Sequence, residues 1–394
     1  MDTQNTPVHS KLWHRDFWLL AFTNLLLSMA VYMLIPILPN FLMEVRDLST
    51  WQVGVVMGVY SIGLFALGPL CSWLIQRYRR NHVCLWSVLL MAATLTLYTH
   101  GHQWFGTILS HDVFFYAFSR FVLGATFGLS QMILCSTLII DVSESFKRTE
   151  ANHSAAWFGR MALALGPIVA LALDTYVAGG DFMTFDVSAI CAVAAFVLIL
   201  LVNFPFKIPD ENVSRFSLDR FFLPSAWIAF VNLVVITTVL GVLMTMKNSL
   251  VVYIMLLVGF VIALLAERFV LRNVEDKTKT VMGLTLMLIA LLILMYLPDV
   301  AIYVTPVFIG FGLSLVGSSF LSYFILLSMH CQRGTSQSSF FLAWECGIGL
   351  GLFLGYSLLP ASEDKVSGAL VIVIIGFVMY KFVTCPWCMR HKNR

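Results

Sequence analysis

Long apolar runs alternate with short polar breaks along the whole chain. A helix that crosses a membrane needs about 20 mostly apolar residues, and twelve runs of this kind are present. They begin near Phe17, Trp51, Val83, Val113, Ser154, Val187, Leu223, Leu250, Val281, Val300, Ser338 and Ser367. The pattern therefore predicts an all-α, polytopic membrane protein with twelve transmembrane helices.

The longest polar break near the middle of the chain, Lys207 to Arg220, separates six of these runs from the other six. We expect an N-terminal six-helix bundle over residues 1–206 and a cytoplasmic central loop over 207–222. A C-terminal six-helix bundle with a short cytoplasmic tail then follows over 223–394.

Composition supports a membrane location. Of the 394 residues, 59% are hydrophobic and only 11% are charged, whereas soluble domains have about 25% charged residues. The polar stretch from Met1 to Asp16 has no apolar core followed by a cleavage site, so we expect no cleaved signal peptide. The net charge of +3 is too small to indicate nucleic-acid binding.

Lysine and arginine are distributed unevenly between the polar breaks. The breaks on the side of the N-terminus hold 19 of them, and the opposite breaks hold only Arg46, Lys247 and Lys365. Because positive residues are retained in the cytoplasm, both termini are predicted to be cytoplasmic. We expect the cell membrane, or the inner membrane if the source has two.

The two halves of the chain repeat short patterns in the same order, which indicates two pseudo-symmetric repeats. The matched segments are 21–25 with 229–233, 68–78 with 259–269, 127–130 with 311–314, and 148–166 with 333–351. One spacing differs: Asn24 and Gly68 are 44 residues apart, but Asn232 and Gly259 are 27 apart. Either the second hairpin is shorter at its outer end, or the Asn24–Asn232 match is accidental.

The segment after the second run resembles the signature of the major facilitator superfamily. In Gly68-Pro-Leu-Cys-Ser-Trp-Leu-Ile-Gln-Arg-Tyr-Arg-Arg80, the family pattern is matched at Gly68, Pro69, Leu70, Arg77 and Arg80. Gln76 stands at the position of the family acid and Arg79 at that of the turn glycine. The resemblance implies a secondary transporter fold in which this loop latches the two halves together, here with a weaker latch.

Three further motifs extend the resemblance over nearly the whole chain. Arg120 and Gly124 match the signature of the fourth helix, and Gly166-Pro167 matches the core of the antiporter signature. The run from Glu345 to Gly351 looks like a run found in efflux-type members. The positions that we expect to serve gating and conformational change are Gly68, Arg77, Arg80, Gly124, Gly166, Pro167, Gly347 and Gly351, although for the glycines close helix packing is the favoured reading.

Three charges inside apolar runs need an explanation, because each costs at least about 2.5–3.5 kcal/mol unless it is paired or hydrated. The resemblance implies that Arg120 lies in the cavity beside a protonation site; the alternative is an arginine that only fixes packing. Arg160 and Glu345 fall at equivalent repeat positions. Either they clamp a polar or zwitterionic substrate, or each pairs within its own half. Because Glu345 lies in an apolar helix, it is the leading proton-carrier candidate, against a fixed ion pair.

Other polar residues add weaker candidates. Asn24, Tyr32, Gln131, Asn232 and Tyr323 lie on predicted cavity helices and could hydrogen-bond substrate, although such residues more often bond neighbouring helices. Asp141 is expected to be a solvated or inter-loop charge. A single Cys385-x-x-Cys388 pair is weak evidence for redox or metal chemistry.

The expected function is transport. No phosphate-binding loop of the Walker type is present, no metal or other cofactor is indicated, and no cluster of catalytic residues points to an enzyme. We expect a monomeric, proton-coupled exporter of a small organic solute. The alternatives are an ion-coupled importer of a sugar, nucleoside or similar nutrient, and a receptor or scaffold that no longer transports.

Overall fold

The computed structural model describes residues 12–110, 113–177, 179–204, 214–246 and 249–392. Within these ranges the regular structure is helical, and twelve spans are long and apolar enough to cross a membrane. The prediction of a twelve-helix membrane protein is therefore confirmed. Several helices begin earlier than the apolar runs, as α9 does at Gly180 rather than near Val187, because hydropathy marks only the membrane core and helices continue past it.

The first six spans are built from nine α-helices with short 3-10 or π turns between some of them. They are α1 (Arg15–Tyr32), α2 (Leu34–Glu44), α3 (Thr50–Ala66), η1 (Gly68–Leu70), α4 (Cys71–Arg77), α5 (Arg80–Ser110), α6 (Val113–Ile133), η2 (Leu134–Leu138), α7 (Ile139–Asp141), η3 (Ser145–Lys147), α8 (Arg148–Tyr176) and α9 (Gly180–Leu200).

The last six spans follow the central loop. They are η4 (Pro224–Ala226), α10 (Trp227–Met244), α11 (Leu250–Phe269), α12 (Asp276–Tyr296), α13 (Pro298–Leu326), η5 (His330–Gln332), α14 (Arg333–Ser357), α15 (Ser362–Met379), η6 (Tyr380–Thr384) and α16 (Cys385–Arg390).

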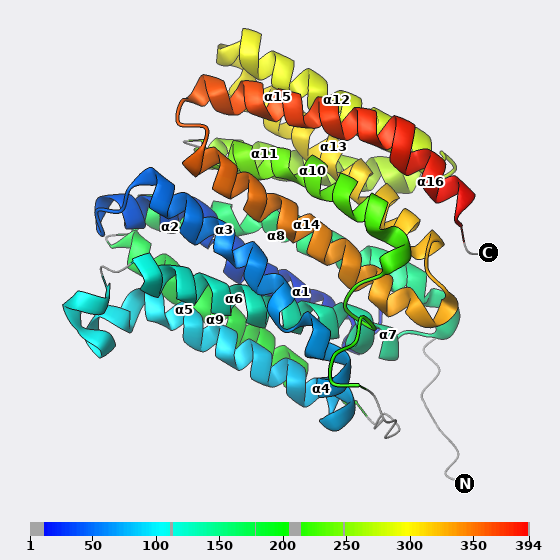
Figure 1. The fold of residues 1–394 in the computed structure, drawn as a ribbon, viewed down its shortest axis with the longest axis horizontal. Helices are drawn as coiled ribbons and strands as arrows, with labels where there is room; N and C mark the ends of the chain where they lie inside the picture. The colour runs from blue at the N-terminus through cyan, green and yellow to red at the C-terminus, as the bar shows by residue number, and fades with distance from the viewer. Residues whose placement is uncertain (1–11, 111–112, 178, 205–213, 247–248, 393–394) are drawn as a thin grey trace.

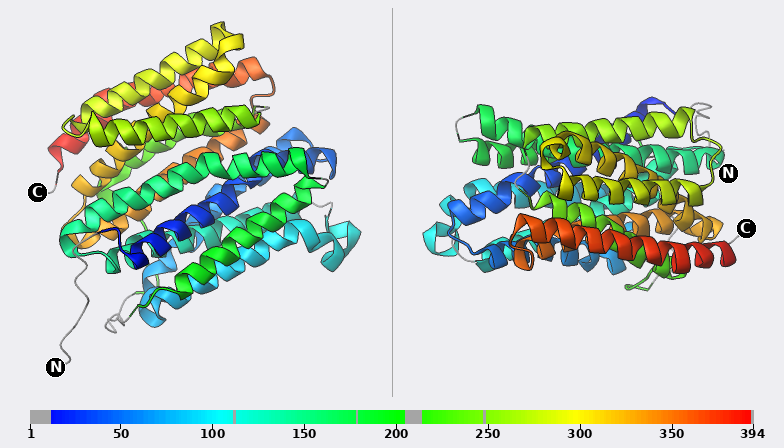
Figure 2. Two further views of the ribbon diagram at one scale, coloured as in Figure 1. Left: turned by 180° about the vertical axis from the view of Figure 1, so that it is seen from behind. Right: turned by 90° about the horizontal axis from the view of Figure 1, so that it is seen from above.

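The helices form two groups that follow the order of the chain. In Figure 1 the helices coloured blue to green lie in the lower part of the molecule, and those coloured light green to red lie in the upper part. Figure 2 shows the same long helices running side by side from two other directions. Across the boundary, α3 packs against α14, and α8 packs against α11. The proposed bundle limits at 207–222 stay a prediction, and residues 207–213 lie outside the described ranges.

Proline explains why the first span is two helices. Pro36 has no N–H with which to bond the carbonyl of Tyr32, so the helix is interrupted at Met33 and resumes as α2. The interruption leaves Tyr32 as the last residue of α1. Its side chain is buried and lies near the boundary between the two halves.

The internal repeat is visible in the local structure. A three-residue 3-10 helix, η3, leads directly into α8 at Arg148, and another, η5, leads directly into α14 at Arg333. At both of these arginines, predicted to be equivalent, a long helix begins directly after a three-residue 3-10 helix. This equivalence places Arg160 of α8 and Glu345 of α14 at the same distance from their helix beginnings.

The unequal hairpin spacing also has a structural reason. The first two spans have 30 and 28 residues, whereas the seventh and eighth have 21 and 20. The loops that join them are equally short, so the missing residues come from the helix ends next to the loop. The second hairpin is thus shorter at that end, as the first of the two alternatives proposed.

The C-terminal segment is more ordered than a tail. The twelfth span continues through the π turn η6 into α16, which ends at Arg390. Cys385 and Cys388 are both buried there and carry free thiols. Burial gives these two cysteines the role of small hydrophobic residues.

Candidate functional site

A small cavity lies near the middle of the molecule, between α1, α6, η2 and α8 of the first half and α14 of the second. Its volume is about 40 Å³, which is room for little more than one water molecule. It gathers five of the eight residues predicted to contact substrate or couple its transport. They are Asn24, Tyr32, Gln131, Arg160 and Glu345.

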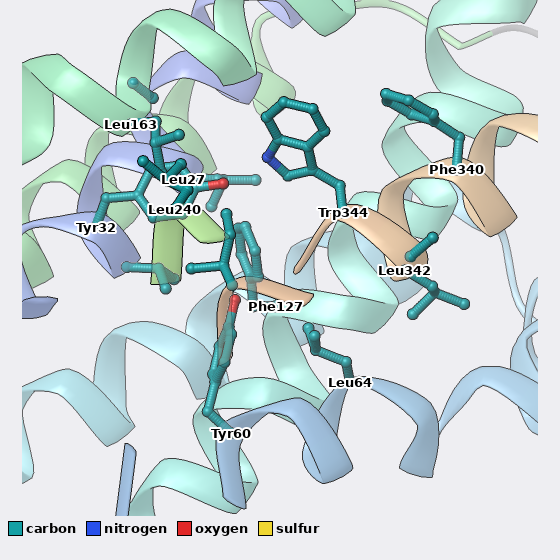
Figure 3. Packing of buried hydrophobic residues seen from close by; sticks show 14 of the residues in the cluster. Leu27, Tyr32, Tyr60, Leu64, Phe127, Leu163, Leu240, Phe340, Leu342 and Trp344 are labelled. Carbon is teal, nitrogen blue, oxygen red and sulfur yellow. The ribbon is translucent and has the colours of Figure 1, made fainter. Parts of the chain in front are cut away.

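Glu345 is held by two tyrosines from the opposite half. The Tyr32 hydroxyl donates to Oε1 of Glu345, and the Tyr60 hydroxyl donates to Oε2 at 3.1 Å. Glu345 is only 2% exposed. Figure 3 shows Tyr32 and Tyr60 with their hydroxyl ends directed toward the middle of the packed cluster. Each carboxylate oxygen thus accepts one hydrogen bond, the pattern suited to an ionised carboxylate.

No ion pair to Glu345 is present among the described residues, where the salt bridges are formed by other groups. The alternative, a fixed ion pair, is therefore not formed in this conformation. Hydrogen bonds to a charged group contribute about 1.5–3 kcal/mol each. Two phenols therefore offset much of the cost of keeping a carboxylate here.

Arg120 lies one side chain farther from the cavity than expected. It is on α6, almost fully buried, with its Cζ 4.9 Å from the ring centre of Tyr60. Its Nε and Nη1 have no hydrogen-bond partner. Arg120 does not line the small cavity. Tyr60 connects Arg120 with Glu345. Its ring makes a cation–π contact with Arg120, and its hydroxyl donates a hydrogen bond to Glu345.

Arg160 crosses to the second half. Its Nη1 donates to the carbonyl oxygen of Ser314 on α13 at 3.2 Å, and its Cζ lies 4.7 Å from the ring centre of Trp157. Gly317 of α13 packs against both Trp344 and the guanidinium, because a Cβ there would lie 2.9 Å from the Trp344 ring and 3.4 Å from Cζ of Arg160. Nε and Nη2 of Arg160 are buried without a partner. Of the two alternatives for Arg160 and Glu345, pairing of each within its own half is not seen, because both are hydrogen-bonded to the other half. The substrate clamp stays a prediction.

Two of the weaker candidates in the cavity already have partners. Nδ2 of Asn24 donates to the carbonyl oxygen of Ala155 on α8 at 2.7 Å. Nε2 of Gln131 donates to the Ser28 hydroxyl at 3.3 Å. Both bonds join helices of the first half. These residues line the cavity and fix helix packing at once.

Two other candidates lie away from the cavity. Nδ2 of Asn232 donates to Oγ1 of Thr384 at 2.8 Å, and the hydroxyl of Tyr323 is 2.7 Å from that of Tyr380. Neither residue lines the cavity, and both bonds join helices of the second half. Each side chain is hydrogen-bonded within the second bundle, which is the interhelix role weighed against substrate binding. Oδ1 of Asn232 is buried there without a partner.

The predicted latch is built differently from the family pattern. Gln76 has a buried Oε1 without a hydrogen-bond partner. Arg80 reaches Asp141, with 2.7 Å between Nη1 and Oδ2, and this pair joins α5 to α7 inside the first half. Asp141 is therefore an inter-loop ion-pair partner rather than a solvated charge. Arg77 is exposed at the end of α4. In the described part of the chain, the salt bridge of this group lies within the first half.

Asp219 of the central loop supplies the carboxylate that Gln76 lacks. The Ser72 hydroxyl of α4 donates to its Oδ2 at 3.3 Å, and the Thr335 hydroxyl donates to its Oδ1 at 3.2 Å. Thr335 lies in the first turn of α14, where a negative charge is favoured by the helix dipole. Asp219 thus connects the first half to the second. This end of the molecule is here called the arginine-rich end, and it carries Arg77, Arg80, Arg148, Arg220 and Arg333.

The glycines pack helices closely, but not all where expected. A Cβ on Gly68 would overlap the ring of Phe221 in the central loop. Gly124 lies against the carbonyl of Tyr60 on α3, and Gly347 and Gly351 lie against α10 of their own half. Two other glycines of α14 lie at the boundary: Gly334 approaches the backbone of Ser136, and Gly349 faces the Ser61 side chain of α3. The halves therefore approach closely at both positions.

Gly166 and Pro167 both lie inside α8 and are buried. A Cβ on Gly166 would lie 3.1 Å from the Met33 nitrogen and from the Tyr32 Cβ. This close approach lets α8 pack where α1 ends. The pair therefore supports the position of Tyr32 and, through it, of Glu345.

Sequence reasoning missed Tyr60 and Asp219. Tyr60 looks like one more aromatic residue in an apolar run, and Asp219 like a loop charge beside Arg220. Nothing in their local pattern marks either one.

In the described part of the chain, no three His, Cys, Asp or Glu side chains gather in a way that could hold a metal ion.

Comparison with known proteins places this arrangement in a family. The chain is 31% identical over 87 residues to the colistin resistance protein EmrB of Acinetobacter baumannii, a stretch that is 22% of this chain and spans only 17% of that protein's length. A bacterial homologue of the iron transporter ferroportin, in an outward-facing state, superposes with a TM-score of 0.67 at 18% identity, covering 96% of this chain and all of the other.

Two further structures have the same fold. The human organic anion transporter MFSD10 superposes with a TM-score of 0.66 at 12% identity, covering 92% of this chain and 98% of its own. The nucleoside transporter NupG superposes with a TM-score of 0.66 at 10% identity, covering 97% of this chain and all of its own. A model of the family described as Major Facilitator Superfamily matches residues 20–352. The chain is therefore a member of the Major Facilitator Superfamily and a secondary transporter.

Proposed function

We propose that this transporter exports a small organic solute in exchange for protons, with Glu345 as the proton carrier. The observation that carries the proposal is the placement of Glu345. It is a buried carboxylate on the second half whose two hydrogen-bond donors, Tyr32 and Tyr60, belong to the first half. A relative movement of the halves changes the surroundings of this carboxylate directly.

The coupling follows from that geometry. While the halves are closed around the cavity, two phenols stabilise the ionised carboxylate. When α3 moves away from α14, the carboxylate loses Tyr60 and is left in an apolar helix, where taking up a proton is favoured over staying charged. The protonated site then recloses and opens to the other side, where a solute that binds in the same cavity displaces the proton to that side. Proton and solute thus occupy the site alternately, as exchange requires.

Arg160 provides the second part of the site. It lines the same cavity as Glu345, and two of its nitrogens have no partner. In an opened cavity these nitrogens offer donors for an anionic or strongly polar group of a solute. The 40 Å³ cavity is too small for an organic solute, so the halves must separate before one can bind.

Export is favoured by two sequence features. The run from Glu345 to Gly351 is similar to that of efflux-type members, and the 87-residue match is to a protein named for colistin resistance. The runner-up is ion-coupled import of a sugar, nucleoside or similar nutrient. The likeness to a nucleoside transporter is at 10% identity, which supports the fold rather than the substrate.

A screen of the purified protein tests the proposal. Thermal stabilisation by a panel of metabolites and drugs identifies a solute, which is then loaded into proteoliposomes. An outward-directed solute flux driven by an inward-directed proton gradient is the expected result. Solute uptake in the same direction as the protons would support the importer instead, and no proton dependence in either direction would overturn the coupling.

A further inference from the structure

A second pocket lies at the arginine-rich end of the molecule and is not part of the central site. Its volume is about 380 Å³, within the range of small-ligand sites. Four arginines from four different segments line it. They are Arg80, Arg148, Arg220 and Arg333.

The charge in this pocket is unbalanced. Arg80 pairs with Asp141, and Nε of Arg220 lies 3.5 Å from Oδ2 of Asp219. Among the described residues, Arg148 forms no salt bridge that would offset its charge. Guanidinium groups hold carboxylate or phosphate by paired N–H donors, so the excess favours an anion.

Two buried polar atoms in the pocket lack a partner. Nε of Arg80 and Oγ of Ser136 make no hydrogen bond, and Arg80 and Ser136 are 9% and 7% exposed. Both atoms are donors. Ser136 lies in the π turn η2, a feature that occurs frequently at functional sites. A bound anion would accept a hydrogen bond from each.

Two long helices begin at the same pocket. α8 begins at Arg148 and α14 begins at Arg333, and neither has a side chain capping its first N–H groups. Gly334 in the first turn of α14 lies against Ser136. Helix N-termini favour anions, and phosphate in particular. The two helix N-termini thus favour an anion in addition to the two buried donors.

We propose that this pocket binds a phosphate-bearing anion that joins the two halves at the arginine-rich end. Arg80, Ser136 and Arg148 come from the first half, and the beginning of α14 comes from the second. The ligand therefore stabilises the conformation that is closed at this end. The same chemistry is offered by the headgroup of an anionic lipid and by a soluble phosphate compound.

The test uses the purified full chain in nanodiscs. In phosphatidylcholine discs, inorganic phosphate is titrated against chloride at equal ionic strength, and the melting temperature is measured. We expect saturable stabilisation by phosphate. Protection of the exposed pocket residue Cys331 from maleimide, located by peptide mass spectrometry, is a second readout.

Three variants locate the site. Arg148→Gln should weaken the apparent phosphate affinity about tenfold, and Ser136→Ala about threefold. The control Arg79→Gln removes an exposed arginine of the same end that does not line the pocket, and should change the affinity less than twofold. An equal effect of Arg79→Gln and Arg148→Gln would show general charge screening and would overturn the proposal.

The source of the phosphate is decided by changing the lipid. If phosphatidylglycerol discs raise the melting temperature in an Arg148-dependent way and abolish the effect of added phosphate, the ligand is a lipid headgroup. If added phosphate acts equally in both kinds of disc, the ligand is soluble. If neither phosphate nor phosphatidylglycerol stabilises the protein or protects Cys331, the pocket is no anion site.

Discussion

Arg160 of α8 and Glu345 of α14 hold equivalent positions in the two repeats, and each reaches across to the other half. Arg160 donates to the Ser314 carbonyl on α13, and Glu345 accepts from tyrosines of α1 and α3. The two charges line one cavity without forming an ion pair in the described structure. Each can therefore change partner when the halves move.

Glu345→Gln should separate solute exchange from proton coupling. Glutamine keeps the size of the side chain and resembles the protonated acid. We expect a folded protein that binds and exchanges solute but no longer accumulates it against a pH gradient in proteoliposomes. Glu363→Gln, at an exposed carboxylate in the first turn of α15, is the control and should transport normally. Gradient-driven transport at the wild-type rate in Glu345→Gln would show that another group carries the proton.

Tyr60→Phe should destabilise the occluded state. It removes one donor from Glu345 while leaving a ring under Arg120. We expect a loss of about 1.5–3 kcal/mol of unfolding free energy if the carboxylate is ionised, measured by denaturation in detergent. Tyr98→Phe is matched to it, because the Tyr98 hydroxyl is buried without a partner, and should cost almost nothing. Equal losses in the two variants would mean that the Tyr60 bond contributes nothing specific.

Asp219→Ala should loosen the arginine-rich end, whereas Gln76→Ala should change transport little. Asp219 accepts hydrogen bonds from both halves, but its side chain is half exposed, so solvent screens the interaction. The expected loss is about 1 kcal/mol, together with faster maleimide labelling of Cys331. Glu275→Gln, an exposed carboxylate at the same end, serves as the control. If Gln76→Ala abolished transport in correctly inserted protein, the assignment of the latch to Asp219 would be wrong.

Gly349→Ala should hinder closure between α3 and α14. A Cβ at this position would overlap the Ser61 hydroxyl, so we expect slower transport at normal expression. Ser61→Gly should restore the rate in the double variant, because it removes the overlapping atom, and the Ser61 hydroxyl has no hydrogen-bond partner to lose. The absence of rescue would show that the defect arises inside α14 rather than at the contact.

The sequence by itself determined the twelve spans, the repeat and the equivalence of Arg160 and Glu345. These are local properties, because a membrane requires about 20 apolar residues for each crossing, and repeated segments keep their spacing. The proline break after Tyr32 is local as well. Gly68 and Gly347 could be recognised as packing positions, but not assigned to a neighbour.

Only the tertiary structure decided which side chains meet. Tyr60 reaches Glu345 although 285 residues separate them, and Asp219 takes the place of the acid that is missing at Gln76. Asn232 and Tyr323 form hydrogen bonds within the second bundle instead of lining the cavity. Lipid and the protein interior are both apolar, so a helix that is apolar all round has no polar stripe that marks its outer face. The rotation of each helix, and with it every partner in the site, is therefore set by close packing between helices rather than by the pattern along one of them.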